Sequence, residues 1–148
     1  MVTSGIVLSK DEIRAVLFSS SGVEYSREQD DFCMRVMLDA AAYILKKDPR
    51  RIVFLDGRTF SRRYQIDQVV ATAVELGQPW RILECVCSDQ TAEMRIEEQR
   101  GSHPAKDRDG GLYLRVKERF QEITLPKTVL NTEQSLAACL ALAGEALR

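Results

Sequence analysis

The stretch RIVFLDGRTFSRR, residues 51–63, decides the fold of this chain. It begins with the apolar run Ile52 to Leu55, which contains β-branched residues and is typical of a strand buried on both faces in a parallel sheet. Asp56 and Gly57 then give a turn signal, and Ser61 is placed to cap a helix. Apolar residues follow at helical spacing, at Ile66, Val69, Val70, Ala73 and Val74. The stretch therefore predicts a buried strand, a turn and a helix.

Polar side chains gather where this strand is expected to end. The residues are Asp56, Arg58, Thr59, Arg62 and Arg63. In open α/β sheets, ligands bind at the carboxyl ends of the strands. We therefore interpret Asp56 as a candidate catalytic residue and the other four as candidate substrate- or phosphate-binding residues. The alternative is that the carboxylate caps a turn and the arginines form a solvated helix face.

Similar signals recur along the whole chain. Strands are expected at 6–8, 52–56, 81–86 and 128–130, with helical patterns between them. Strands that alternate with helices indicate a parallel sheet with right-handed crossovers, flanked by helices. The sequence thus predicts an α/β fold in a single domain over residues 1–148.

Two of the expected helices bear on the site. Ser9 and Glu12 have the spacing of a capping box, which predicts a helix that starts at Ser9. Asp11 then lies in its first turn and Arg14 on the same helix face, either as site residues or as a surface ion pair. A second helix should run from about residue 30 to residue 47; its sequence is apolar nearly all round, so we expect it to be substantially buried.

Composition limits the classes of function. The chain has 148 residues, 45% of them hydrophobic, and a formal net charge of −1, which argues against binding to double-stranded nucleic acid. It contains no apolar run of membrane-spanning length. Its single histidine and four scattered cysteines argue against a zinc site and fit a cytoplasmic protein with reduced thiols.

Residues 101–111 interrupt every periodic pattern. They read GSHPAKDRDGG, a polar, glycine-rich and charged segment of the kind that forms mobile lids. His103 and Arg108 are the candidates for closing on a bound phosphate.

Four motifs in order now suggest a family. They are VLSKDEIR at 7–14, IVFLDGRTFSRR at 52–63, CSDQTAEMRIEEQR at 87–100 with HPAKDR after it, and VLNTEQSL at 129–136. Together the motifs resemble those of the AAA-type P-loop kinases related to polynucleotide kinase, zeta toxin and chloramphenicol phosphotransferase. The resemblance covers essentially the whole chain and implies ATP-dependent phosphoryl transfer, with Mg²⁺, to a hydroxyl of a small molecule or nucleotide.

The resemblance also implies roles for individual residues. Asp11 corresponds to the general base on the acceptor hydroxyl, and Arg14 to the arginine that holds substrate or phosphate. Asp56 falls where the family has an acid near substrate or Mg²⁺. Arg95 and Arg100 fall where lid arginines contact nucleotide phosphates.

One part of the family pattern is missing. The chain contains no phosphate loop of the form G-x-x-x-x-G-K-[ST], and it opens at about the family's second strand. Either the start of the chain has been assigned or cut too late, which we favour, or a natural form has lost the loop. In the second case the chain would be a non-catalytic interaction or regulatory module. Without the family's first strand, we expect exposed sheet edges, self-association and weak ATP binding.

Overall fold

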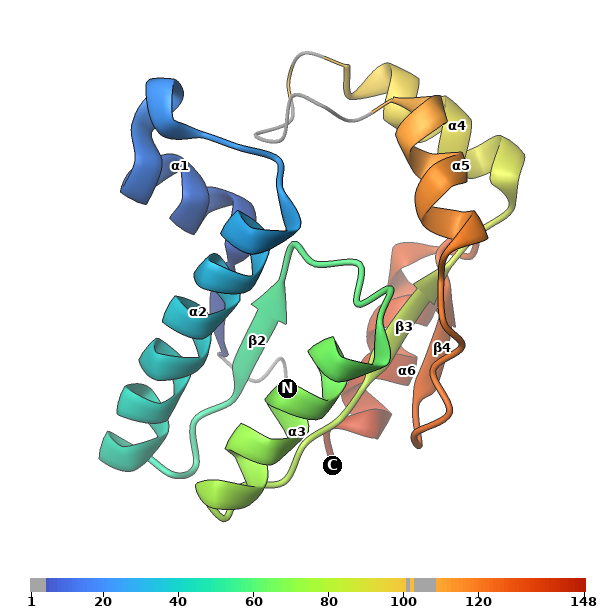
Figure 1. Cartoon of the computed structure of the whole chain (residues 1–148). Helices are drawn as coiled ribbons and strands as arrows, with labels where there is room; N and C mark the ends of the chain where they lie inside the picture. Colours follow the sequence, from blue (N-terminus) through green and yellow to red (C-terminus); the bar gives the residue numbers. More distant parts are fainter. Residues whose placement is uncertain (1–4, 101, 103–108) are drawn as a thin grey trace. The chain divides into compact units, whose positions relative to one another are not determined.

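The computed structural model describes residues 5–100, 102 and 109–148 (Figure 1). Helices and strands alternate along these residues as the sequence predicts. The elements are β1 (Ile6–Ser9), α1 (Lys10–Gly22), α2 (Arg27–Lys47), β2 (Val53–Asp56), α3 (Arg63–Glu75), β3 (Leu83–Val86), α4 (Asp89–Glu98), α5 (Gly110–Glu118), β4 (Thr128–Asn131) and α6 (Leu136–Ala146).

The chain divides into two compact units, which we describe separately. Unit 1 comprises Met1–Phe60 and Tyr64–Gln78, and unit 2 comprises Ser61–Arg63 and Pro79–Arg148. The expectation of a single domain over residues 1–148 stays a prediction.

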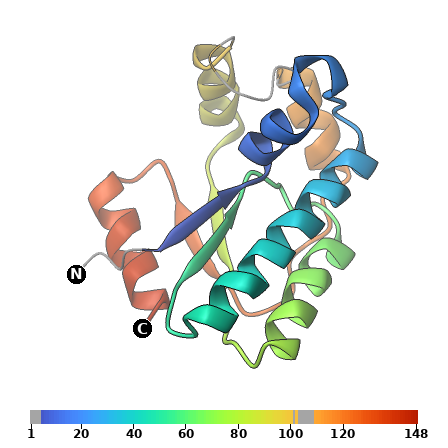
Figure 2. The ribbon, with the colours of Figure 1, turned by 90° about the vertical axis from the view of Figure 1, so that its left-hand side faces the viewer.

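Unit 1 is built on a pair of parallel strands. β1 pairs with β2 in the register Ile6↔Val53 to Ser9↔Asp56, so both strands end at the same edge. Figure 2 shows the two strands side by side, with α1 continuing directly from the end of β1. The first turn of α1 therefore starts at the carboxyl end of the strand pair.

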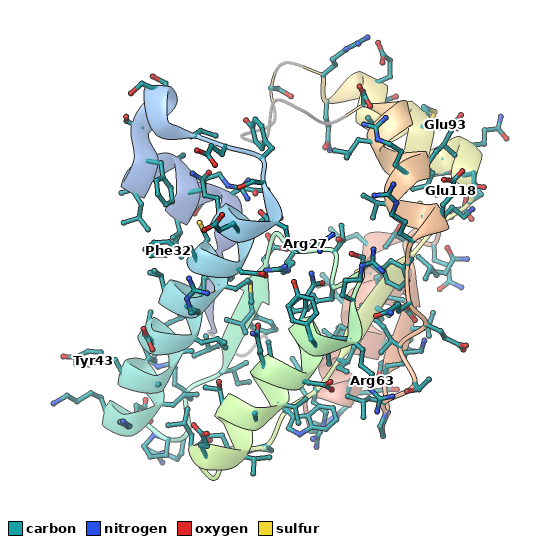
Figure 3. All side chains as sticks on the ribbon, viewed as in Figure 1. Arg27, Phe32, Tyr43, Arg63, Glu93 and Glu118 are labelled. Atoms are coloured by element: carbon teal, nitrogen blue, oxygen red, sulfur yellow. The ribbon has the colours of Figure 1, made fainter. Side chains whose placement is uncertain are left out.

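Helix α2 supplies most of the core of unit 1. Its buried residues Cys33, Met34, Met37 and Ala41 recur at helical spacing and form one stripe. Phe32 and Tyr43 lie outside that stripe and are 42% and 67% exposed (Figure 3). The expectation that α2 is substantially buried holds for this stripe but not for the positions of Phe32 and Tyr43, because an apolar composition does not decide how many faces of a helix are covered.

Helix α1 is irregular at both ends. Ser9 occupies the N-cap position, but its side chain makes no capping hydrogen bond, so the predicted capping box does not form. Asp11 nevertheless lies in the first turn. Near the other end, Ser19 has a φ of 50° and interrupts the helical backbone.

Unit 2 is built on the second pair of parallel strands. β3 pairs with β4 in the register Leu83↔Thr128 to Val86↔Asn131, and α6 packs against β4. Ser88, Asp109 and Ser135 cap α4, α5 and α6 by accepting a hydrogen bond from a backbone N–H of the first turn. Lys127 pairs with Glu84 at 2.8 Å beside the strands.

The described strands form two parallel pairs. β1 pairs with β2 in unit 1 and β3 pairs with β4 in unit 2, which gives two sheets of two strands. The class is as predicted, since parallel strands are flanked by helices. The joining of all four strands in one sheet stays a prediction.

None of the helices in the described part of the chain is both long and apolar enough to span a membrane.

Candidate functional site

The start of α1 brings together the charged residues that the sequence singled out. Lys10 and Asp11 form the first turn of the helix, and Arg14 follows one turn later on the same side. The turn after β2 approaches this helix start closely, since a Cβ at Gly57 would lie 3.2 Å from the Lys10 backbone nitrogen. Gly57 also has a φ of +87°, which favours glycine.

Four of these charges form one network across α1 and α2. Lys10 Nζ lies 2.7 Å from Asp30 Oδ1 and 3.3 Å from Asp11 Oδ1. Arg14 Nη1 lies 3.3 Å from the same Asp11 oxygen, and Arg14 Nη2 donates to Asp30 Oδ1. Asp30 belongs to the first turn of α2, so the network ties the beginnings of the two helices together.

The network is largely buried. The side chains of Lys10, Arg14 and Asp11 are 9%, 4% and 14% exposed. Burial lowers the pKa of Lys10, and the nearby Asp11 carboxylate offsets part of that effect. The alternative of a surface ion pair between Asp11 and Arg14 is therefore wrong, because such pairs are solvated and this one is not.

A second ion pair lies beside the first on α2. Arg58 Nη2 donates to Asp31 Oδ1 at 2.6 Å, and the Arg58 side chain is 4% exposed. The Tyr64 hydroxyl lies 3.2 and 3.1 Å from the two Asp31 oxygens. Asp30 and Asp31 are adjacent in sequence, so one turn of helix anchors two different arginines.

Two nitrogens of these arginines have no hydrogen-bond partner among the described residues. They are Arg14 Nε and Arg58 Nη1, and both atoms are buried. A buried donor without a partner costs about 1–3 kcal/mol, so each such group in a native protein calls for an explanation such as a water or a ligand.

Neighbouring side chains fix the position of the network. The Arg14 guanidinium lies over the ring of Tyr25, with Cζ 5.4 Å from the ring centroid. Gln29 donates to the Gly22 carbonyl at 2.9 Å and accepts from the Glu24 N–H at 2.8 Å, which holds the connection between α1 and α2. Cys33 is fully buried next to the cluster, and burial raises the pKa of its thiol.

Asp56 lies at the same edge of the strand pair as the network. It is opposite Ser9 in the register, one residue before the turn at Gly57, and it is exposed. Thr59 is also exposed. The register thus places Asp56 beside Ser9, the residue before α1, although the two are far apart in the sequence. The common cleft expected for Asp11, Arg14 and Asp56 stays a prediction.

The remaining candidate arginines belong to unit 2. Arg95 donates to the Thr132 hydroxyl and carbonyl, both at 2.8 Å, so its guanidinium holds the end of β4. Arg100 pairs with Glu97 on the surface at 3.1 Å. The backbone N–H of Arg63 donates to the Gln121 side chain at 2.8 Å, and Arg62 is half-buried. Roles in phosphate binding stay predictions for all four.

The predicted lid falls mostly outside the described residues. His103 and Arg108 both lie there. At the end of the segment, Gly110 and Gly111 form the first turn of α5, where Leu112 N donates to Asp109 Oδ1 at 2.6 Å. The lid boundary at residue 111 is therefore wrong, because the aspartate caps a helix that begins at Gly110.

Three members of the cluster are not predicted from the sequence: Asp30, Asp31 and Tyr64. The consecutive aspartates are visible in the sequence, but acidic residues in the first turn of a helix usually complement its dipole. Tyr64 carries no local signal at all. Asp30 and Asp31 can be recognised as members of the cluster only because the fold places them next to Arg14 and Arg58. Tyr64 can be recognised only because it contacts Asp31.

The residues present could contribute to a Mg²⁺ site, but they do not include a site for the phosphates of ATP. Among the described residues, no group of three or more His, Cys, Asp or Glu side chains could hold a metal ion. Mg²⁺ in kinases is commonly bound by one or two carboxylates together with substrate phosphates, and the exposed Asp56 can supply one. The sequence provides no glycine loop for nucleotide phosphates, so the donor side does not fit the residues present.

Comparisons with known proteins identify the kind of fold. No family model matches the chain, and no curated protein matches it in sequence. A solved structure from Chloroflexus aurantiacus J-10-fl, described as a "putative kinase", matches with a TM-score of 0.70 and 17% identity, over 97% of this chain and 85% of that one. The tunicamycin resistance protein of Deinococcus radiodurans matches with a TM-score of 0.59 and 14% identity, over 95% of this chain and 81% of that one. The chain therefore has a kinase-like fold.

Proposed function

We propose that this chain carries the acceptor side of a kinase that transfers a phosphoryl group from ATP, with Mg²⁺, to a hydroxyl of a small molecule or nucleotide. The observation that carries the proposal is the buried network of Lys10, Asp11, Arg14 and Asp30 at the carboxyl end of β1. Phosphoryl transfer needs a carboxylate beside the attacking hydroxyl and cations around the transferred group. The network offers both, and the kinase-like fold supports the same reading.

Each residue has a defined part in this proposal. Asp11 accepts the proton of the acceptor hydroxyl as the hydroxyl oxygen forms its bond to the γ-phosphorus of ATP. The bond from that phosphorus to the bridging oxygen breaks, and ADP leaves. Arg14 and Lys10 orient that carboxylate, because both contact its Oδ1 atom. Asp56 binds Mg²⁺ or substrate. Four further residues bind substrate or phosphate: Arg58, Thr59, Arg62 and Arg63. Arg95, Arg100, His103 and Arg108 are the proposed lid residues.

The donor side requires residues that this sequence does not contain. We propose that a phosphate loop and its strand precede the sequence in the working enzyme, which acts in the cytoplasm. That loop would supply the backbone N–H groups and the lysine that hold the nucleotide phosphates.

The test compares this chain with an upstream-extended version. Calorimetric titration with ATP and magnesium should show micromolar binding to the extended chain and none to the short one. In the extended chain, Asp11→Asn should lower kcat by about 10²–10⁴-fold with little change in nucleotide affinity, since a general base acts in the chemical step. Tight ATP binding by the short chain, or an equal loss of kcat and affinity in the variant, would contradict the proposal.

A second candidate function is a non-catalytic interaction or regulatory module. The absence of the G-x-x-x-x-G-K motif from the sequence favours it. Such a module would associate through exposed sheet edges, with itself or with a partner. An extended chain that binds a partner but neither binds ATP nor transfers phosphate would support this alternative.

A further inference from the structure

The outward side of α2 carries a regular row of side chains. At helical spacing this row lies opposite the buried residues Cys33, Met37 and Ala41 of the same helix. Tyr43 borders the row and points away from β2 (Figure 3). The positions are spaced alternately by four and three residues, as in the a/d seam of a coiled coil. We call them the outer stripe of α2, and all are exposed except the half-buried alanine: Glu28, Phe32, Arg35, Asp39, Ala42 and Lys46.

The charged side chains of the outer stripe have few contacts within their own chain. In the described part of the chain, Glu28, Asp39 and Lys46 make no side-chain hydrogen bond or ion pair. The Arg35 guanidinium lies over the Phe32 ring, with Cζ 5.7 Å from the ring centroid, and no carboxylate among the described residues pairs with it. The four charges are therefore available to a partner.

The order of these charges makes the outer stripe complementary to itself. Two copies of α2 can lie antiparallel about a two-fold axis that passes near Met37. Arg35 then faces Asp39 of the second copy, and Glu28 faces Lys46 of the second copy. A two-fold interface uses the same surface twice, so each of these pairs of opposite charge occurs twice.

Other arrangements of the same stripe bring like charges together. A parallel pair of helices places each charged residue beside its own copy. An antiparallel pair shifted by one heptad brings Glu28 to Asp39 in one direction and Arg35 to Lys46 in the other. Like charges that face each other in an interface are unfavourable, so the charges select the one antiparallel register centred near Met37.

We propose that two copies of this chain form a dimer through their outer stripes, in this antiparallel register. Phe32 packs against the small side chain of Ala42 of the second copy, which gives the contact an apolar part. The interface extends along one helix, so it is small and the dimer is weak, with a dissociation constant on the order of 10–100 µM. This surface is separate from the strand edges, and the proposed phosphoryl transfer does not depend on it.

Analytical ultracentrifugation of the full chain over a range of concentrations tests the proposal. We expect a monomer at about 1 µM that becomes a dimer towards about 200 µM. Arg35→Glu and Asp39→Arg should each weaken the dimer at least tenfold, because each substitution turns two pairs of opposite charge into two pairs of like charge. Arg100→Glu is the control, since it makes the same charge change at an exposed arginine of unit 2 and should leave the dimer as it is.

Mixing the two variants gives the sharper test. The Arg35→Glu chain is acidic at both positions and the Asp39→Arg chain is basic at both, so one copy of each restores every pair of opposite charge. An equimolar mixture should therefore dimerise at least as well as the parent, although each variant alone stays monomeric. Glu28→Lys mixed with Lys46→Glu repeats the test at the ends of the outer stripe, in case a variant of the first pair does not fold by circular dichroism.

Three results would overturn the proposal. One is a chain that stays monomeric at every concentration. Another is an association that Arg35→Glu and Asp39→Arg leave unchanged, which would assign it to another surface such as the strand edges. The third is a mixture of folded variants that remains monomeric, which would show that the two positions do not face each other.

Discussion

Asp30 of α2 accepts from Lys10 Nζ of α1 at 2.7 Å, and this contact joins the first turns of two helices that follow one another in the chain. The same Asp30 oxygen accepts from Arg14 Nη2. One carboxylate therefore balances two buried cations, which leaves Asp11 with weaker contacts of 3.3 Å to each of them. In the proposed reaction this division is useful, because Asp11 remains available to a substrate.

The first prediction concerns this shared carboxylate. Asp30→Asn should lower the free energy of unfolding by about 3 kcal/mol, because it leaves two buried cations with one carboxylate between them. Urea denaturation measures the effect. The control is Asp39→Asn, an exposed aspartate on the same helix, which should change stability by less than about 0.5 kcal/mol. Equal stability of the two variants would show that the network does not hold α1 to α2.

The second prediction concerns the approach of Gly57 to α1. Gly57→Ala should destabilise unit 1 by about 1–2 kcal/mol, since a side chain there meets both a positive φ and the Lys10 backbone nitrogen at 3.2 Å. The matched control is Gly144→Ala within α6, where a Cβ meets nothing within 4 Å. That change should stabilise the chain by about 0.5–1 kcal/mol. Thermal melting of both variants gives the comparison, and a neutral Gly57→Ala would contradict the close approach.

The third prediction separates a structural arginine from a surface arginine. Arg95→Ala should lower the free energy of unfolding by about 2 kcal/mol, because it removes two hydrogen bonds from a charged donor to Thr132. Arg100→Ala should cost less than about 0.5 kcal/mol, since its pair with Glu97 is exposed. Chemical denaturation of the two variants measures the difference. An unfolding free energy unchanged by Arg95→Ala, with nucleotide affinity lost in the extended chain, would assign Arg95 to the lid instead.

The fourth prediction is a pH effect in unit 2. The hydrogen bond to Asp89 raises the pKa of Tyr113 from 10 to about 12. The folded pKa is above the unfolded one, so this stabilising contribution is complete below pH 10 and is lost as the pH rises towards 12. Tyrosinate absorbance, with Tyr113→Phe to assign the signal, should show one late titration that moves towards pH 10 in Asp89→Ala. An identical titration curve in Asp89→Ala would contradict the assignment.

The sequence by itself determined the local structure. The apolar run at 52–55, the turn at Asp56 and Gly57 and the helical spacing after Ser61 correspond to β2, the turn and α3, with ends shifted by one or two residues. It also placed Asp11 in a first turn at the end of a strand, as observed. These features depend on residues that are close together in the sequence. Their backbone preferences and hydrophobic periodicity are therefore enough to predict them.

Only the tertiary structure decided which residues act together. Lys10 and Arg14 are buried because α2 covers them with Asp30. Arg58 is anchored because Asp31 of α2 accepts from it, and Tyr64 of α3 contacts the same carboxylate. No local pattern distinguishes a carboxylate that complements a helix dipole from one that anchors a buried guanidinium. The difference lies in desolvation, which depends on the residues that fold over the charge from distant parts of the sequence.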